Sequence, residues 1–176
     1  MFERKTTRLA AMAAVAAMAT PMAAHADGAK NLQVAGRALT FLENGPTGAT
    51  KMGVVFDPSN AGSVAEKNAV MAALGAGYNA GSVTLTGTAV EASSVAGVSG
   101  VKVLYVTKGV NYASVGAAAK AKKIITIGSD AACANSGACV MAVETEPKVE
   151  IIVNRATAAA VGAAFKAAFR MMIKEV

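Results

Sequence analysis

Histidine is nearly absent from this 176-residue sequence, and its single copy, His25, lies near the N-terminus. A Ser-His-Asp triad, a Cys-His pair and histidine-based zinc or copper sites all need an imidazole. The N-terminal segment has the pattern of a signal peptide, and its removal would leave a chain without histidine. We therefore expect a protein that is not an enzyme and that has no catalytic residue, no metal site and no cofactor.

Cysteine is nearly as scarce, since the chain contains only Cys133 and Cys139. Two cysteines are too few to hold a structural zinc without help. In an oxidising compartment, a pair so close together in the sequence is expected to form an intrachain disulfide. A redox-active pair is the alternative, although the Cys-x-x-Cys spacing of redox motifs is missing. The spacing predicts a local disulfide, and whether its role is structural or redox-regulatory stays open.

A long apolar run that could span a bilayer is also missing. The chain begins with Arg4, Lys5 and Arg8, continues with an apolar segment from Leu9 to about Met22, and then reads Ala24-His25-Ala26. This segment is shorter than the roughly 20 residues of a membrane span, and the three parts match a secretory signal peptide cleaved after Ala26. An uncleaved anchor or an ordinary Ala-rich helix is the alternative. We expect residues 1–26 to be removed and residues 27–176 to form one periplasmic domain.

The chain has no strong excess of one charge and no extended run of basic or acidic residues. The signal segment accounts for three of the 17 basic and one of the 11 acidic residues, so the mature chain carries a surplus of about four positive charges. The one basic cluster is Lys120, Lys122 and Lys123, and it has no interleaved aromatic residues. Single-stranded nucleic acid needs such a basic, aromatic surface. Nucleic acid is therefore not an expected partner.

Short apolar runs alternate with helical patterns along the rest of the chain. Such alternation predicts an α/β fold with a mostly parallel sheet and flanking helices, ending in an antiparallel hairpin and a final helix. Helices are expected over 30–43, 64–74, 91–96, 112–122 and 155–175, strands over 51–57, 82–85, 101–106, 124–127, 139–143 and 149–153, and a loop over 128–138.

Polar residues follow several of the predicted parallel strands. Ligands of open parallel sheets bind beyond the carboxyl ends of the strands, where loop amides and helix N-termini meet. The alternative is structural, because Ser59 or Asn60 would cap a helix and Asp57-Pro58 would form a turn in most proteins of this kind. The candidate ligand-binding residues are Asp57, Ser59, Asn60, Ser63, Thr107, Lys108, Ser129 and Asp130.

Two family resemblances add to this interpretation. The segment 53–65 resembles the opening of one lobe of the periplasmic solute-binding proteins of ABC transporters. Such proteins enclose a ligand between two lobes, so a two-lobed binding protein here would need two chains to pair as a homodimer.

The Cys133 to Cys139 loop, followed by an apolar strand that ends in Asn154, resembles the YfiR family of periplasmic proteins, which look like single-lobed relatives of solute-binding proteins.

The YfiR resemblance implies a regulator or sensor that acts through protein contacts. Its partner would be an envelope protein, such as an inner-membrane diguanylate cyclase of cyclic-di-GMP signalling or an outer-membrane receptor. The resemblance also implies a redox-sensitive disulfide state. The alternative function is a small-molecule-binding protein that serves an ABC-type or receptor-linked uptake system, motivated by the polar residues at the strand ends.

Overall fold

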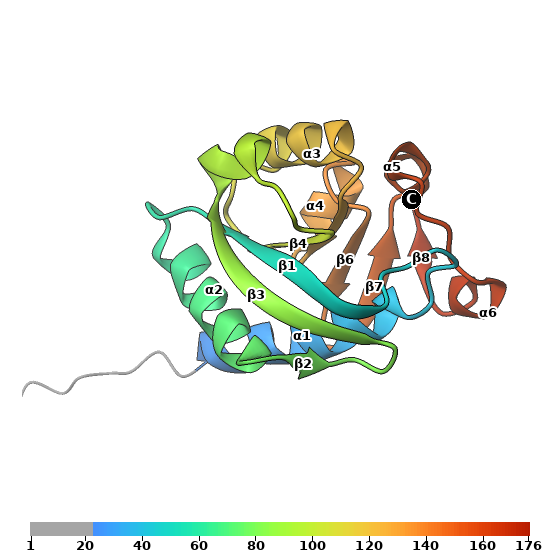
Figure 1. Cartoon of the computed structure of the whole chain (residues 1–176), viewed down its shortest axis with the longest axis horizontal. Coiled ribbons are helices and arrows are strands. Elements are labelled where there is room, and N and C mark those ends of the chain that lie inside the picture. The colour runs from blue at the N-terminus through green and yellow to red at the C-terminus, as the bar shows by residue number, and fades with distance from the viewer. Residues whose placement is uncertain (1–22) are drawn as a thin grey trace, which may run out of the picture.

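The computed structural model describes residues 23–176, in which one twisted sheet has helices on both of its faces (Figure 1). In chain order the elements are α1 (Ala23–Leu39), β1 (Gly48–Phe56), α2 (Ala61–Leu74), β2 (Tyr78–Asn79), β3 (Val83–Glu91), the 3-10 helix η1 (Ala92–Gly97), β4 (Val103–Val106), α3 (Tyr112–Ala121), β5 (Ile125–Gly128), α4 (Ala131–Asn135), β6 (Met141–Glu144), β7 (Glu150–Val153), α5 (Arg155–Val161), α6 (Ala167–Arg170) and β8 (Lys174–Glu175).

The sheet has eight strands in the order β2-β3-β1-β4-β5-β6-β7-β8. The five central strands, β3, β1, β4, β5 and β6, run parallel to one another. β7 runs antiparallel to β6, and the short strand β2 runs antiparallel to β3. The predicted α/β class, the mostly parallel sheet and the C-terminal hairpin are therefore confirmed.

Two apolar clusters lie on opposite faces of the sheet. On one face Leu39 of α1 and Leu74 of α2 pack with strand residues such as Val54, and on the other Val115 of α3 packs with Val55 and the disulfide. Figure 1 shows α1 and α2 on one side of the sheet and α3 and α4 on the other. Neighbouring strand residues face opposite sides, so the run of apolar residues in β1 is buried on both faces.

A polar side chain caps the N-terminus of each of four helices. The side-chain oxygen accepts a hydrogen bond from a backbone N–H of the first turn, which otherwise has no partner within the helix. The capping pairs are Asn60 with Ser63 in α2 (3.1 Å), Asn111 with Ser114 in α3 (3.2 Å), Asp130 with Ala132 in α4 (2.8 Å) and Asn154 with Thr157 in α5 (2.9 Å).

The prediction of one long C-terminal helix over 155–175 is wrong. α5 ends at Gly162, whose φ of 77° lies in the left-handed region that glycine adopts without strain. The chain then turns back, and the ring of Phe169 stacks with those of Phe41 and Phe165 at centroid distances of 4.9 and 5.3 Å. The helical spacing of these aromatic residues therefore reflects packing against the end of α1, and the segment finishes in β8 beside β7.

Three further expectations differ from the structure. The expected loop 128–138 contains α4. The expected strand 82–85 extends to Glu91, because β3 pairs with β1 along its whole length. The expected helix 30–43 ends at Leu39, and a turn follows it.

The predicted signal peptide, residues 1–26, lies mostly outside the described residues, so its cleavage after Ala26 stays a prediction. α1 begins at Ala23. None of the helices between residues 23 and 176 combines the length and the apolar character that a membrane span requires.

Candidate functional site

The loop after β1 is held by hydrogen bonds among its own residues. Asp57 Oδ1 accepts hydrogen bonds from the backbone N–H (2.8 Å) and the hydroxyl (2.6 Å) of Ser59. These bonds lower the pKa of the Asp57 carboxyl from its usual value. The geometry is that of a turn closed by an Asp side chain. Two of the candidate ligand-binding residues therefore shape the loop itself.

Ser63 and Thr107 are buried beneath this loop. The Ser63 hydroxyl lies 2.7 Å from the Thr107 hydroxyl and accepts a hydrogen bond from the Asp57 backbone N–H. The Thr107 hydroxyl donates to the Val55 carbonyl at 2.9 Å. Both hydroxyls thus join the start of α2 to the ends of β1 and β4, and neither faces solvent. Together with the capping role of Asn60, these bonds support the structural alternative for the first loop.

Lys108 and Ser129 lie in a different place, a crevice at the carboxyl edge of the parallel strands. The crevice has a volume of about 80 Å³. Its walls come from α1, from the loops after β4 and β5, and from the turn between β6 and β7. The lining residues are Asn31, Lys108, Ser129, Glu144, Thr145 and Glu146.

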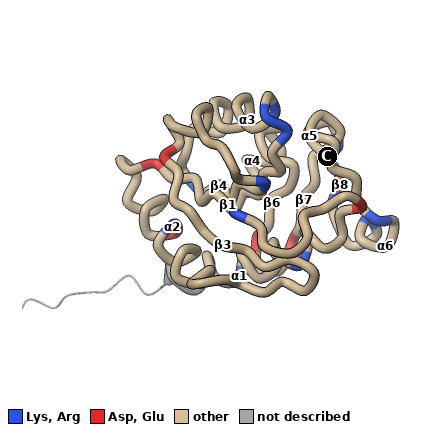
Figure 2. Tube along the Cα trace, viewed as in Figure 1, with Lys and Arg blue, Asp and Glu red and all other residues tan. Residues whose placement is uncertain are grey.

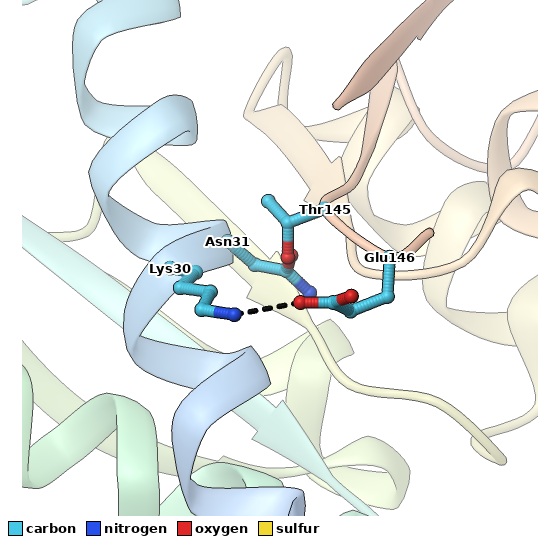
Figure 3. A network of polar contacts seen from close by, with 4 residues as sticks. All are labelled: Lys30, Asn31, Thr145 and Glu146. Atoms are coloured by element: carbon cyan, nitrogen blue, oxygen red, sulfur yellow. Dashed lines mark hydrogen bonds and ion pairs between the residues drawn. The ribbon is translucent and has the colours of Figure 1, made fainter. Parts of the chain in front are cut away.

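Polar contacts hold α1 against the β6–β7 turn at the rim of this crevice (Figure 3). The Lys30 ammonium forms an ion pair with Glu146 at 2.6 Å, and the Thr145 hydroxyl donates to Asn31 Oδ1 at 2.7 Å. Glu144 accepts a hydrogen bond from the Ala131 backbone N–H at 3.0 Å. Segments far apart in the sequence are thereby fixed around one small polar space.

A buried polar network lies beside the crevice. Glu66 of α2 is only 8% exposed and accepts a hydrogen bond from the Tyr105 hydroxyl at 3.0 Å. Its second oxygen accepts from the Lys108 backbone N–H at 2.9 Å, which fixes the loop that carries the Lys108 side chain. Burial, followed by the negative charge of Glu66, raises the pKa of Tyr105 well above its usual value.

Sequence reasoning missed Asn31, Glu66, Tyr105 and the acidic residues of the β6–β7 turn. For Glu66 a signal existed, because the residue lies one helical turn before the buried Val70 and so occupies a core-facing position in α2. A carboxylate at such a position is rarely buried without a polar partner. For the others, the tertiary fold alone brings them to the crevice.

Asp130, the remaining strand-end candidate, acts at the start of α4. One carboxylate oxygen caps that helix, and the other accepts a hydrogen bond from the Tyr112 hydroxyl at 3.2 Å. Burial and the adjacent Asp130 charge raise the pKa of Tyr112. Asp130 therefore links α3 to α4 and does not line the crevice.

Cys133 and Cys139 form the expected disulfide, with Cα atoms 5.2 Å apart and both side chains buried. The bridge packs against the end of β5, where a Cβ at Gly128 would lie 2.8 Å from the Cβ of Cys133. Asn154, the residue of the YfiR-like motif, donates a hydrogen bond to the Ala134 carbonyl at 3.0 Å in addition to capping α5. Its side chain thus ties the disulfide loop to α5.

The comparisons with known proteins agree on the fold. No family model and no curated protein matches the chain. Three solved structures share its fold. A conserved domain protein from Vibrio cholerae O1 biovar El Tor is 12% identical, with a TM-score of 0.59 over 84% of this chain. An ABC domain in complex with L-Trp from Streptococcus pneumoniae is 12% identical, with a TM-score of 0.61 over 85% of this chain, and a substrate-binding protein with adhesive properties from Clostridium difficile, in a ligand-free, open state, is 15% identical, with a TM-score of 0.57 over 84% of this chain.

The chain therefore shares the α/β fold of these three structures, one of which is a substrate-binding protein. It covers 59%, 60% and 58% of the lengths of these three structures. Within the part of the chain that the structure describes, no three His, Cys, Asp or Glu side chains gather as a metal site would require.

Proposed function

We propose that the chain is a small-ligand-binding protein of the cell envelope that works without catalysis. The observation that carries this proposal is the polar crevice at the carboxyl edge of the sheet, lined by Lys108, Ser129 and Glu144. This edge is where ligands of open α/β sheets bind. The similarity of the fold to substrate-binding proteins supports the same function, which sequence analysis gave as the alternative.

The ligand class follows from the charges around the crevice. Lys108 offers one ammonium group, while Glu144 and Glu146 offer carboxylates. A zwitterionic ligand, with an acidic group toward Lys108 and an amino group toward Glu144, matches this arrangement. The Streptococcus pneumoniae structure contains L-Trp, an amino acid of this class. A volume of about 80 Å³ accommodates the head group only, so the rest of the ligand would extend into solvent or against a second copy of the chain.

A thermal-shift screen of amino acids tests this proposal. A ligand at about 100 times its Kd stabilises the folded state by about 2.7 kcal/mol. In a domain of this size that corresponds to an increase in Tm of roughly 5–10 °C. Lys108→Met and Glu144→Gln should abolish the shift, and the second variant keeps an oxygen for the Ala131 N–H. Lys174→Met, a distant exposed lysine on β8, is the charge-matched control and should respond like the wild type.

Failure of every amino acid in the screen to raise the Tm would refute ligand binding at this crevice. An equal shift in the wild type and in Lys108→Met would place the ligand elsewhere. Sedimentation with and without ligand shows whether two chains pair around it.

A second candidate function is the YfiR-like one, regulation of an envelope partner through protein contacts. The observation in its favour is the exposure of two adjacent apolar residues, Met171 (85%) and Met172 (63%). Flexible methionine side chains are over-used at binding surfaces that adapt to partners. Crosslinking in cells should recover an inner-membrane cyclase or an outer-membrane receptor. A double change to glutamate at these positions should abolish recovery and leave the thermal shift intact.

Export to the periplasm is part of the proposal. It rests on the signal-like residues 1–26 and on the disulfide, which persists in oxidising compartments. N-terminal sequencing of the protein from the periplasmic fraction should begin at Asp27. Recovery of the unprocessed chain from the cytosol with two free thiols would contradict it.

A further inference from the structure

A second cavity lies at the opposite, amino edge of the parallel strands. Its volume is about 340 Å³, within the range of small-molecule sites. The starts of β4 and β5, the end of α5 and the turn after α1 surround it. Its apolar wall consists of Leu42, Pro46, Val101, Ile124, Ile125 and Val161. The pocket is open to solvent, and its volume is large enough for a substituted aromatic ring.

Three lysines, Lys102, Lys122 and Lys123, line the same cavity, and the lining contains no acidic residue. The ion pairs of the described residues involve Lys30, Arg155 and Arg170, and none of the three cavity lysines. The Lys122 ammonium donates a hydrogen bond to the Val98 carbonyl at 3.0 Å. Lys102 and Lys123 are therefore available to a bound anion.

The helix ends near the cavity do not cancel this charge. α3 and α5 both end beside it, and each helix C-terminus carries a partial charge of about −0.5. Three ammonium groups against two such ends leave a positive surplus of about two charges. Figure 2 shows basic segments beside α3 and near β1 and β4, in line with this estimate.

The backbone at Lys123 is unusual. Its φ of 53° is the one positive value of a non-glycine residue between residues 23 and 176. Glycine or asparagine normally occupies such a position, because a Cβ is disfavoured in the left-handed region. Strained residues that persist cluster at binding sites. A lysine held in this conformation, in the lining of the cavity, points to a requirement for its charge.

We propose that this cavity binds a small organic anion with an apolar body, such as an aryl-substituted carboxylate. The carboxylate pairs with the Lys102 and Lys123 ammonium groups, and the apolar body contacts the wall formed by Ile124, Ile125 and Val161. The site is separate from the crevice at the carboxyl edge, whose lysine and glutamates suit a zwitterion. The sheet thus carries two sites of different charge preference at its two edges.

Titration of the full chain with 3-phenylpropionate, followed by NMR or calorimetry, tests this proposal. Binding is expected with a Kd of about 1 mM or tighter. The neutral amide of the same acid, a probe of matched shape, should bind at least about tenfold more weakly, because it cannot pair with the lysines. Affinity for the acid should fall with added salt. Chemical shifts should move at Ile125 and Val161 and stay unchanged at Ser129.

Two variants test whether the ligand binds in this cavity. Lys102→Met and Lys123→Gly should each weaken binding about tenfold, and the glycine variant removes the charge at a position where the backbone prefers glycine. Lys148→Met, an exposed lysine of the β6–β7 turn, should bind like the wild type. Equal binding of acid and amide, unchanged affinity in both cavity variants, or no binding at millimolar acid would each overturn the proposal.

Discussion

The buried pair Glu66 and Tyr105 makes the stability of the protein depend on pH in the alkaline range. The Tyr105 side chain is fully buried and its pKa is raised in the folded state, whereas in the unfolded chain it titrates near the usual tyrosine pKa of about 10. The folded state therefore keeps its phenol proton when the unfolded state loses it. Stability from this group is present below pH 10 and is lost as pH rises above it.

The size of the effect follows from the unfolded-state pKa. Between pH 9 and pH 11, ionisation stabilises the unfolded state by about 1.4 kcal/mol for one tyrosine that stays neutral in the fold. In Tyr105→Phe this ionisation is absent, so the unfolded state of the variant is not stabilised by it at high pH. At pH 7 the variant should be less stable than the wild type by about 1.5–3 kcal/mol, because the buried Glu66 carboxylate loses a hydrogen bond. This difference should shrink by about 1.4 kcal/mol at pH 11.

Urea denaturation at pH 7, 9 and 11 measures these differences. Val103→Ala, which removes buried apolar atoms and no ionisable group, is the control and should keep a constant difference from the wild type at all three pH values. A stability gap between the wild type and Tyr105→Phe that does not change from pH 9 to pH 11 would refute the reasoning.

Three further changes test the fold around the sites. Replacing both Cys133 and Cys139 with alanine should lower the free energy of unfolding by about 2 kcal/mol, measured in urea, and an unchanged midpoint would contradict this. Asn154→Ala should cost about 1–2 kcal/mol, because the variant loses both the cap on Thr157 and the hydrogen bond to the Ala134 carbonyl, and an unchanged stability would contradict this. Lys123→Gly should raise the Tm by a few degrees, and a lower Tm would show that the left-handed backbone is not strained.

Much of the fold was predictable because it depends on local patterns. Asn60 caps the start of α2 and Gly75 ends it, as expected for such residues, and the apolar run of β1 predicted a strand. The C-terminal segment was not predictable in this way. Its aromatic residues have helical spacing, but Gly162 and the stacking of Phe169 on Phe41 turn the chain away from a helix.

Less of the candidate site was predictable. The rule that ligands bind at carboxyl strand ends selected Lys108 and Ser129, which do line the crevice. The same rule selected Ser63 and Thr107, whose hydroxyls are buried and bonded to each other. Polar residues at strand ends serve capping and ligand binding equally well, and sequence cannot distinguish the two.

The sequence by itself determined the alternation of strands and helices, the caps and the short disulfide loop, because each depends on residues within a few positions of one another. Only the tertiary structure decided which polar groups are buried, and that Glu66 meets Tyr105 while Lys102 and Lys123 meet at one cavity. These contacts join residues from different elements. Their geometry depends on how the sheet twists and how the helices pack on it, which no local pattern encodes.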